Sequence, residues 1–335
     1  MTITLEQTNK TNALDRLLSA TKEGMNEVNK LILTRAESHV KMVPELANHL
    51  IQSGGKRLRP MLTIACASMF KENSKDAIYF AAAVEFMHNA TLLHDDVVDE
   101  SKMRRGKPAA RMIWGNQASV LVGDFLLGQA FLMMVETRDL DALNILSKAA
   151  TIIAEGEVFQ LSKVLDFTTS PKEYDQVIRS KTATLFEAAT KVGALAGGAK
   201  KEHCEALALY GAELGRAFQL VDDALDYGGL SGALGKNTGD DLREGKMTLP
   251  IILALQNANE KEKSLITSAL GNQNLDNEIL AQVIKLLKEK NTLSQTLDEA
   301  KNSVKKAKAA LKELPKHEML DLLCDIADFT LLRAN

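Results

Sequence analysis

Residues 92–100 read Leu92-Leu93-His94-Asp95-Asp96-Val97-Val98-Asp99-Glu100, an apolar run that ends in three aspartates spaced D-D-x-x-D. The apolar residues before the aspartates predict a helix. Residues four apart share a helix face, so Asp95 and Asp99 point the same way and repel each other. A multivalent cation between the carboxylates would remove that repulsion, and oxygen ligands suit a hard cation such as Mg²⁺. A second copy, Asp222-Asp223-Ala224-Leu225-Asp226, makes a solvated acidic face a poor explanation of both.

The composition around these motifs predicts an all-α protein. The chain has 335 residues, only six prolines and 4% aromatic residues, and β-branched runs are few. The formal net charge of −3 gives no indication of nucleic-acid binding. Three cysteines, Cys66, Cys204 and Cys324, lack C-x-x-C spacing, which argues against a zinc site and a disulfide framework. We interpret them as buried thiols of a cytoplasmic protein.

Helical spacing of apolar residues continues along the chain, and no linker divides it. It predicts helices over residues 12–43, 45–53, 61–70, 76–100, 118–136, 141–165, 171–195 and 201–227, and helical structure from 251 to 335. Residues 101–117 and 228–239 are predicted to be loops. We expect one domain over 1–335, with a flexible polar tail at 1–12 that lacks the apolar core of a signal peptide. The apolar run 118–135 contains Asp124 and is short for a membrane span.

Two basic loops accompany the acidic motifs. The first, residues 53–60, reads Ser-Gly-Gly-Lys-Arg-Leu-Arg-Pro, and the second carries Arg104-Arg105-Gly106. Free backbone amides, a helix N-terminus and guanidinium groups form a phosphate-binding composition. A solvated basic turn would have the same composition, and the second loop could simply balance the aspartates. Lys181, among apolar neighbours, is a further candidate phosphate contact.

Six motifs in order make the chain resemble the trans-isoprenyl (polyprenyl) diphosphate synthases of the long-chain, octaprenyl or decaprenyl kind that makes quinone side chains. They are 54–60, Asp95–Asp99, Arg104–Gly106, Lys181-Thr182, Phe218-Gln219 with Asp222–Asp226, and Gly235–Asp241. The resemblance implies an isoprenoid-synthase helical bundle around a deep central cavity, usually as a homodimer. It implies a prenyltransferase that adds isopentenyl diphosphate head-to-tail to an allylic diphosphate of farnesyl or geranyl type. It also implies about three Mg²⁺ per active site, with Mn²⁺ able to substitute.

The resemblance further implies a role for individual residues. The catalytic residues are Asp95, Asp99, Lys181 and Asp222. Isopentenyl diphosphate is held by Lys56, Arg59, His88 and Arg105. The allylic diphosphate is held by Arg104, Lys181, Thr182, Gln219 and Lys236. Metal is held or supported by Asp95, Asp96, Asp99, Asp222, Asp223 and Asp226, with Asp240 in support and Lys246 as a weaker addition. His94 is taken as structural.

Small residues before the first motif bear on product length. Thr91 and Ala90 lie about one turn before Asp95, with Ala81–Ala83 two turns further back. In the resembled family a bulky aromatic there stops elongation, so Ala90 and Thr91 predict a long product, roughly C40 to C50. Alanines that merely favour a helix would look the same. Met133 and Met134 are hypothetical tunnel-floor residues, although methionine is also a common core filler.

Three other kinds of protein share some of these features. A class I terpene cyclase shares the first aspartate motif but normally carries a different second metal motif and needs no isopentenyl diphosphate site. A non-catalytic subunit of a heteromeric synthase has typically lost one or both motifs. A structural Ca²⁺-binding protein would leave the basic loops unexplained, and EF-hand spacing is absent from the sequence. Because the product is greasy, transient membrane association is the most contact with a membrane that we expect.

Overall fold

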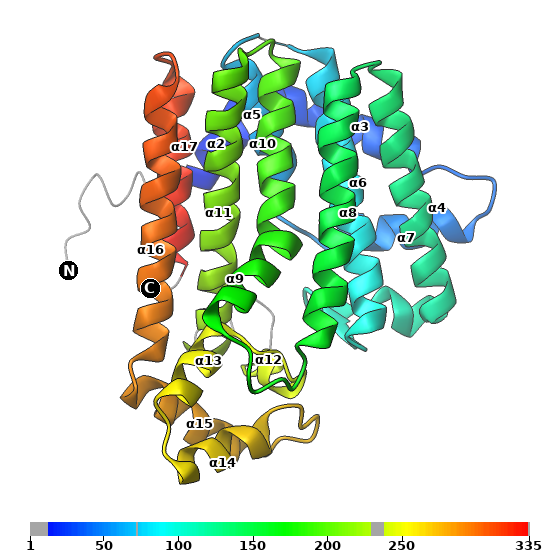
Figure 1. Cartoon of the computed structure of the whole chain (residues 1–335). Coiled ribbons are helices and arrows are strands. Elements are labelled where there is room, and N and C mark those ends of the chain that lie inside the picture. The colour runs from blue at the N-terminus through cyan, green and yellow to red at the C-terminus, as the bar shows by residue number, and fades with distance from the viewer. Residues whose placement is uncertain (1–12, 72, 229–237, 334–335) are drawn as a thin grey trace.

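The computed structural model describes residues 13–71, 73–228 and 238–333. Most long helices stand side by side, and α14 and α15 lie across one end of the bundle (Figure 1). The helices are α2 (Ala13–Ala20), α3 (Lys22–Arg35), α4 (Met42–Gln52), α5 (Leu58–Ser68), α6 (Lys75–Val98), α7 (Ala110–Glu136), α8 (Leu140–Ser162), α9 (Pro171–Ile178), the π-helix η1 (Arg179–Ala183), α10 (Thr184–Ala196), α11 (Lys201–Gly228), α12 (Asp240–Arg243), α13 (Leu249–Gln256), α14 (Glu260–Ala269), α15 (Asn277–Glu289), α16 (Thr292–Ala310), the 3₁₀ turn η3 (Leu311–Glu313) and α17 (Glu318–Leu332). The all-α prediction is confirmed. The predicted tail at 1–12 and Lys236 lie outside the described residues.

Polar side chains at the helix starts fix where several elements begin. Ser74 accepts a hydrogen bond from the backbone N–H of Ala77 at the start of α6, and Asp139 accepts one from Ala142 in α8. Ser170 and Glu173 form a reciprocal capping box at the start of α9. Such caps satisfy backbone N–H groups that have no partner within the helix. They set the start of α6 and α9, which carry or lead into the site.

Three predicted boundaries were wrong. Residues 101–117 are not all loop, because α7 starts at Ala110 after a two-residue antiparallel ladder, β1 (Met103–Arg104) with β2 (Lys107–Pro108). Within the predicted loop, Gly115 (φ 85°, ψ 167°) forms a kink inside α7. The segment 12–43 is divided at Thr21 and after Arg35. The segment 171–195 is interrupted by η1.

Two buried apolar clusters hold the helices together, and α11 runs through both. Leu214 and Ala217 belong to the larger cluster, while Leu220 and Val221 of the same helix belong to the smaller one. The partly buried Leu331 packs against both clusters. We infer from this continuity that the described helices form one domain.

Helix α7 combines a buried and an exposed apolar face. Met133 and Met134 are fully buried in the larger cluster, whereas Leu121, Leu132 and Val135 are 66%, 52% and 56% exposed. Among the described residues α7 is also the one helix with the length and apolar composition of a membrane span, a criterion that core helices of soluble proteins also meet. Burial of the two methionines is the behaviour of core residues.

Candidate active site

The first aspartate motif lies at the C-terminal end of α6, beside a cavity of about 660 Å³. Asp95 and Asp99 line this cavity, as their shared helix face predicts. Asp96 is 1% exposed, and its Oδ1 accepts a hydrogen bond from Nε of Arg104 at 2.8 Å and forms an ion pair with Nη2 at 2.7 Å. The motif therefore presents two carboxylates to the cavity and uses the third to hold Arg104.

The second motif, on α11, faces the same cavity with a different arrangement. Asp222 and Asp223 line the cavity. Asp223 is almost fully buried and accepts hydrogen bonds from the Tyr174 hydroxyl at 2.5 Å and from Gln219 Nε2 at 2.7 Å. Asp226 accepts from the backbone N–H groups of Asp240 and Asp241, both at 3.2 Å, and so anchors the start of α12. Asp222 is thus the carboxylate of this motif best placed to act on a ligand.

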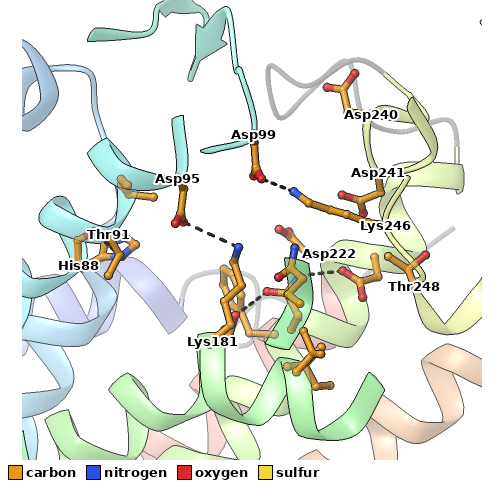
Figure 2. A pocket seen from close by; sticks show the side chains of 18 of the residues that line it. His88, Thr91, Asp95, Asp99, Lys181, Asp222, Asp240, Asp241, Lys246 and Thr248 are labelled. Carbon is orange, nitrogen blue, oxygen red and sulfur yellow. Dashed lines mark hydrogen bonds and ion pairs between the residues drawn. The ribbon is translucent and has the colours of Figure 1, made fainter. Parts of the chain in front are cut away.

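Three cations lie against Asp95, Asp99 and Asp222, and Figure 2 shows the pairs that Lys181 forms with Asp95 and Lys246 forms with Asp99. Lys181 Nζ is 3.9 Å from Asp95, Lys246 Nζ is 2.9 Å from Asp99, and an Arg333 guanidinium nitrogen is 2.8 Å from Asp222. Burial, together with the charge of Asp99, raises the pKa of Asp95 even though Lys181 opposes the shift. Each of these aspartates therefore has a cationic partner. When a metal–diphosphate binds, the metal would take the place of the cation beside the aspartate, and the cation would pair with the diphosphate.

The aspartates fit a metal that is shared with a ligand better than a metal held by protein alone. Among the described residues no group of three or more His, Cys, Asp or Glu side chains converges closely enough to hold an ion. Mg²⁺ usually takes one or two protein carboxylates and completes its shell with water and substrate phosphates. Asp95 and Asp99 on one side, and Asp222 on the other, meet that requirement.

Lys181 and Thr182 reach the cavity from the π-helix η1, which widens the turn between α9 and α10. The Thr182 hydroxyl donates to Gln219 Oε1 at 2.8 Å, and Gln219 in turn donates to Asp223. Single π-turns occur frequently at functional sites. The hydrogen bonds tie the η1 pair to the second motif, so the two predicted groups form one structure.

A second group of cations lines the cavity around the loop before α5. Lys56, Arg59, His88 and Arg105 all line the cavity. Gly55 has φ +149°, and a Cβ there would lie 2.5 Å from a guanidinium nitrogen of Arg105. The positive φ favours glycine here, and a Cβ would displace the guanidinium from this loop.

The basic side is crowded with positive charge. Burial, and then the charge of Arg333, lowers the pKa of Lys56. Burial lowers the pKa of Arg59 to about 10, although Glu85 opposes the shift, and burial with the nearby arginines lowers the pKa of His88 well below its usual value. Cations that destabilise one another in a cavity favour an anion between them. This side has the electrostatics of a diphosphate site.

The structure brings together most of the residues predicted from the sequence. Those that line the same cavity are Lys56, Arg59, His88, Thr91, Asp95, Asp99, Arg104, Arg105, Lys181, Thr182, Gln219, Asp222, Asp223, Asp240 and Lys246. Three predicted site residues do not line it: Asp96, Asp226 and Ala90. Ala90 is 2% exposed in the larger apolar cluster. His94 packs between α6 and α7, with Nε2 3.2 Å from the Val120 carbonyl oxygen and 3.4 Å from Asp124.

The comparisons agree with this geometry. The polyprenyl synthetase family matches residues 40–287. The chain belongs to that family. Its sequence is 41% identical to the octaprenyl diphosphate synthase of Haemophilus influenzae over 94% of this chain and 95% of the relative. A polyprenyl synthase from Caulobacter crescentus, solved with calcium and isoprenyl diphosphate, superimposes with a TM-score of 0.92 at 47% identity and covers 96% of this chain and 98% of its own. A decaprenyl diphosphate synthase from Rhodobacter capsulatus gives 0.91 at 45% identity, with coverages of 96% and 99%.

As a member of the polyprenyl synthetase family the protein is a prenyltransferase, which excludes the structural Ca²⁺-binding interpretation. Several cavity-lining residues of this prenyltransferase were missed in the sequence: Tyr174, Glu157, Glu244 and Arg333. Glu157 and Glu244 contact Lys181 and Lys246 at 2.9 and 2.5 Å. Nothing in their local sequence distinguishes them from solvated helix residues, because only the packing of distant helices brings them to the cavity.

Proposed function

We propose that this member of the family is a long-chain all-trans polyprenyl diphosphate synthase. It joins isopentenyl diphosphate head-to-tail, in repeated 1′-4 condensations, to an allylic diphosphate primer of farnesyl or geranyl type. The observation that carries the proposal is a single cavity that Asp95, Asp99 and Asp222 line together with a second group of cations around Arg59 and Arg105. The aspartates suit a metal-bound diphosphate, and the cations suit a second diphosphate.

The residues near the aspartates would hold the allylic diphosphate as its C–O bond breaks. Mg²⁺ ions held by Asp95, Asp99 and Asp222 would neutralise the charge that develops on the leaving diphosphate. Lys181, together with Thr182, Gln219 and Arg104, would hold the remaining oxygens in fixed positions, which is electrostatic stabilisation by groups that need no rearrangement. Asp96, Asp223 and Asp226 would support them through the hydrogen bonds described above. Lys236 stays a predicted contact of the allylic diphosphate, and Asp240 a predicted support of the metal-binding aspartates.

The basic side would hold isopentenyl diphosphate so that its double bond faces the allylic carbon. Lys56, Arg59, His88 and Arg105 would bind its phosphates. The alkene attacks the allylic cation, a carbon–carbon bond forms, and the departed diphosphate takes the proton that is lost. Apolar rings such as Phe186 and Phe218, which line the cavity, would keep water from the cation.

The assay that tests this function supplies purified protein with Mg²⁺, farnesyl diphosphate and radiolabelled isopentenyl diphosphate. We expect elongation to a product of roughly C40 to C50, suited to a quinone side chain, as the octaprenyl and decaprenyl names of the relatives suggest. Manganese should substitute in part, and chelation should stop the reaction. Formation of a cyclic hydrocarbon without isopentenyl diphosphate would instead identify a terpene cyclase.

Product length is tested by a pair of substitutions on α6. Thr91 lines the cavity and Ala90 is buried beside it, and both were predicted to leave room for the growing chain. Thr91→Phe and Ala90→Phe should both shorten the product. A variant that keeps the wild-type product would remove its residue from the set that determines length. A loss of stability of about 1–3 kcal/mol without shortening would mean that the residue only packs the core.

We further propose that two copies pair through the apolar face of α7 and α8 in the cytoplasm. Leu121, Leu132 and Val135 on α7 and Val158 on α8 are more than half exposed, which is costly unless another surface covers them. Light scattering should show a dimer, and Leu121→Glu with Leu132→Glu should give monomers. A wild-type monomer that binds lipid vesicles would assign the face to a membrane instead.

A further inference from the structure

The contact between α8 and the π-helix places an unassigned carboxylate beside Lys181. A Cβ at Gly156 of α8 would lie 2.4 Å from Ser180 Cβ and 3.3 Å from the backbone nitrogen of Lys181. Only a glycine lets the two backbones approach so closely. This close contact places the next residue, Glu157, beside the Lys181 side chain.

Glu157 and Asp95 share Lys181 unequally. Lys181 Nζ donates to Glu157 Oε2 at 2.9 Å, whereas it is 3.9 Å from Asp95. The first distance is that of a charge-assisted hydrogen bond, and the second is beyond hydrogen-bond range. Glu157 therefore holds the ammonium group, and Asp95 experiences only its charge.

This ion pair is not a solvated surface pair. The side chains of Lys181 and Glu157 are 24% and 25% exposed, and both line the cavity. Glu157 Oε1 is buried and has no hydrogen-bond partner among the described residues. Exposed ion pairs contribute little and tolerate exchange of partners, but a pair confined by packing fixes geometry.

We propose that Glu157 is a positioning residue that holds Lys181 away from Asp95, so that Asp95 stays free for the cation and Lys181 for the diphosphate. Without the Glu157 charge, Asp95 is the nearest carboxylate for Lys181. A direct Lys181–Asp95 pair would compete with a divalent ion for the same oxygens. This inference rests on the proposed function, because it concerns binding of a metal–diphosphate.

Binding of Mg²⁺ and inorganic diphosphate, followed by titration calorimetry in the absence of turnover, tests the proposal. In Glu157→Gln the Mg²⁺ concentration needed for half-maximal diphosphate binding should rise about tenfold, a size typical of coupled neighbours. The Michaelis constant for isopentenyl diphosphate should change less than twofold. The matched control is Asp141→Asn, an exposed acid on the same helix that does not line the cavity, and it should behave as wild type.

A double-mutant cycle separates positioning from direct metal binding. If Glu157 acts through Lys181, then Glu157→Gln should change nothing further in a Lys181→Gln background. A rise in the Mg²⁺ requirement that persists in that background would overturn the proposal, and so would a single variant with wild-type binding. If Glu157→Gln fails to fold by circular dichroism, Glu157→Asp carries the test, with a smaller shift in the same direction expected and no shift contradicting the proposal. Elongation by the wild-type protein is measured separately. Its absence would contradict the proposed function, whereas the binding experiments test the role of Glu157.

Discussion

The ends of α6 and α11 carry the same D-D-x-x-D letters but use them differently. In both motifs the middle aspartate is buried, with Asp96 held by Arg104 and Asp223 held by Tyr174 and Gln219. In α6 the last aspartate, Asp99, lines the cavity. In α11 the last aspartate, Asp226, binds the backbone at the start of α12.

This difference shows that the spacing of the aspartates does not by itself determine what each of them does. A four-residue spacing places two carboxylates on one helix face, but the elements packed against that face decide what they contact. Around α6 the face opens on the cavity, and Asp99 meets Lys246. Around α11 the same position is covered by α12. We therefore infer that the first motif provides two metal-facing carboxylates and the second provides one.

The largest expected effect is loss of turnover when a cavity-facing aspartate is removed. Asp95→Ala or Asp222→Ala should lower kcat about 10³-fold or more, because leaving-group stabilisation is usually the dominant catalytic contribution. Circular dichroism should show a folded protein in each case. Near-normal kcat in either variant would contradict the metal assignment and the division of roles between the motifs.

The basic side gives the next effect. Arg105→Ala removes a charge-assisted contact, which corresponds to about 1.5–3 kcal/mol and hence to a rise of about 10- to 100-fold in the Michaelis constant for isopentenyl diphosphate. The Michaelis constant for the allylic primer should rise much less. Steady-state kinetics with each substrate varied in turn distinguishes the two. The reverse pattern would exchange the roles of Arg104 and Arg105.

The last aspartates of the two motifs provide a matched pair. Asp226→Asn should lower the free energy of unfolding by about 1 kcal/mol, as loss of a helix-capping carboxylate does, with a moderate loss of activity. Asp99→Asn should affect kcat severely and stability little. Urea unfolding and kcat measured on both variants test this. Equal profiles would mean that the two positions are equivalent after all.

The sequence predicted what local patterns control. The apolar periodicity of 76–100 and 201–227 agrees closely with α6 and α11. The motif spacing predicted that Asp95 and Asp99 share a helix face, and both line the cavity. The start of α7 was missed because Gly115 is a local break signal within a helix that tertiary packing continues on both sides. Arg333 and Glu157 could not be foreseen, since α17 and α8 reach the cavity only through long-range packing.

The smallest expected effect is a pH dependence of stability. It concerns α6 and not α11, because α6 also carries His88 beside the arginines. Burial and the charges of Arg59, Arg105 and Arg104 lower the pKa of His88 well below its usual value. Above pH about 6.5 the imidazole is neutral in both the folded and the unfolded chain, so it contributes nothing to pH dependence. Below that pH His88 becomes protonated in the unfolded chain but stays neutral in the folded chain. The free energy of unfolding therefore falls as the pH falls.

The loss reaches at most about 1.4 kcal/mol one pH unit below the unfolded pKa. Between pH 7.5 and 5.5 the free energy of unfolding of the ligand-free wild type should therefore fall by about 1 kcal/mol more than that of His88→Gln. Urea unfolding of both proteins at the two pH values measures the difference. Glu85, which faces the same arginines, is present in both proteins, and its contribution cancels to first order. A smaller fall in the wild type than in the variant would show that the folded protein binds the proton, with Glu85 as its partner, and that an anion is not needed to neutralise this side.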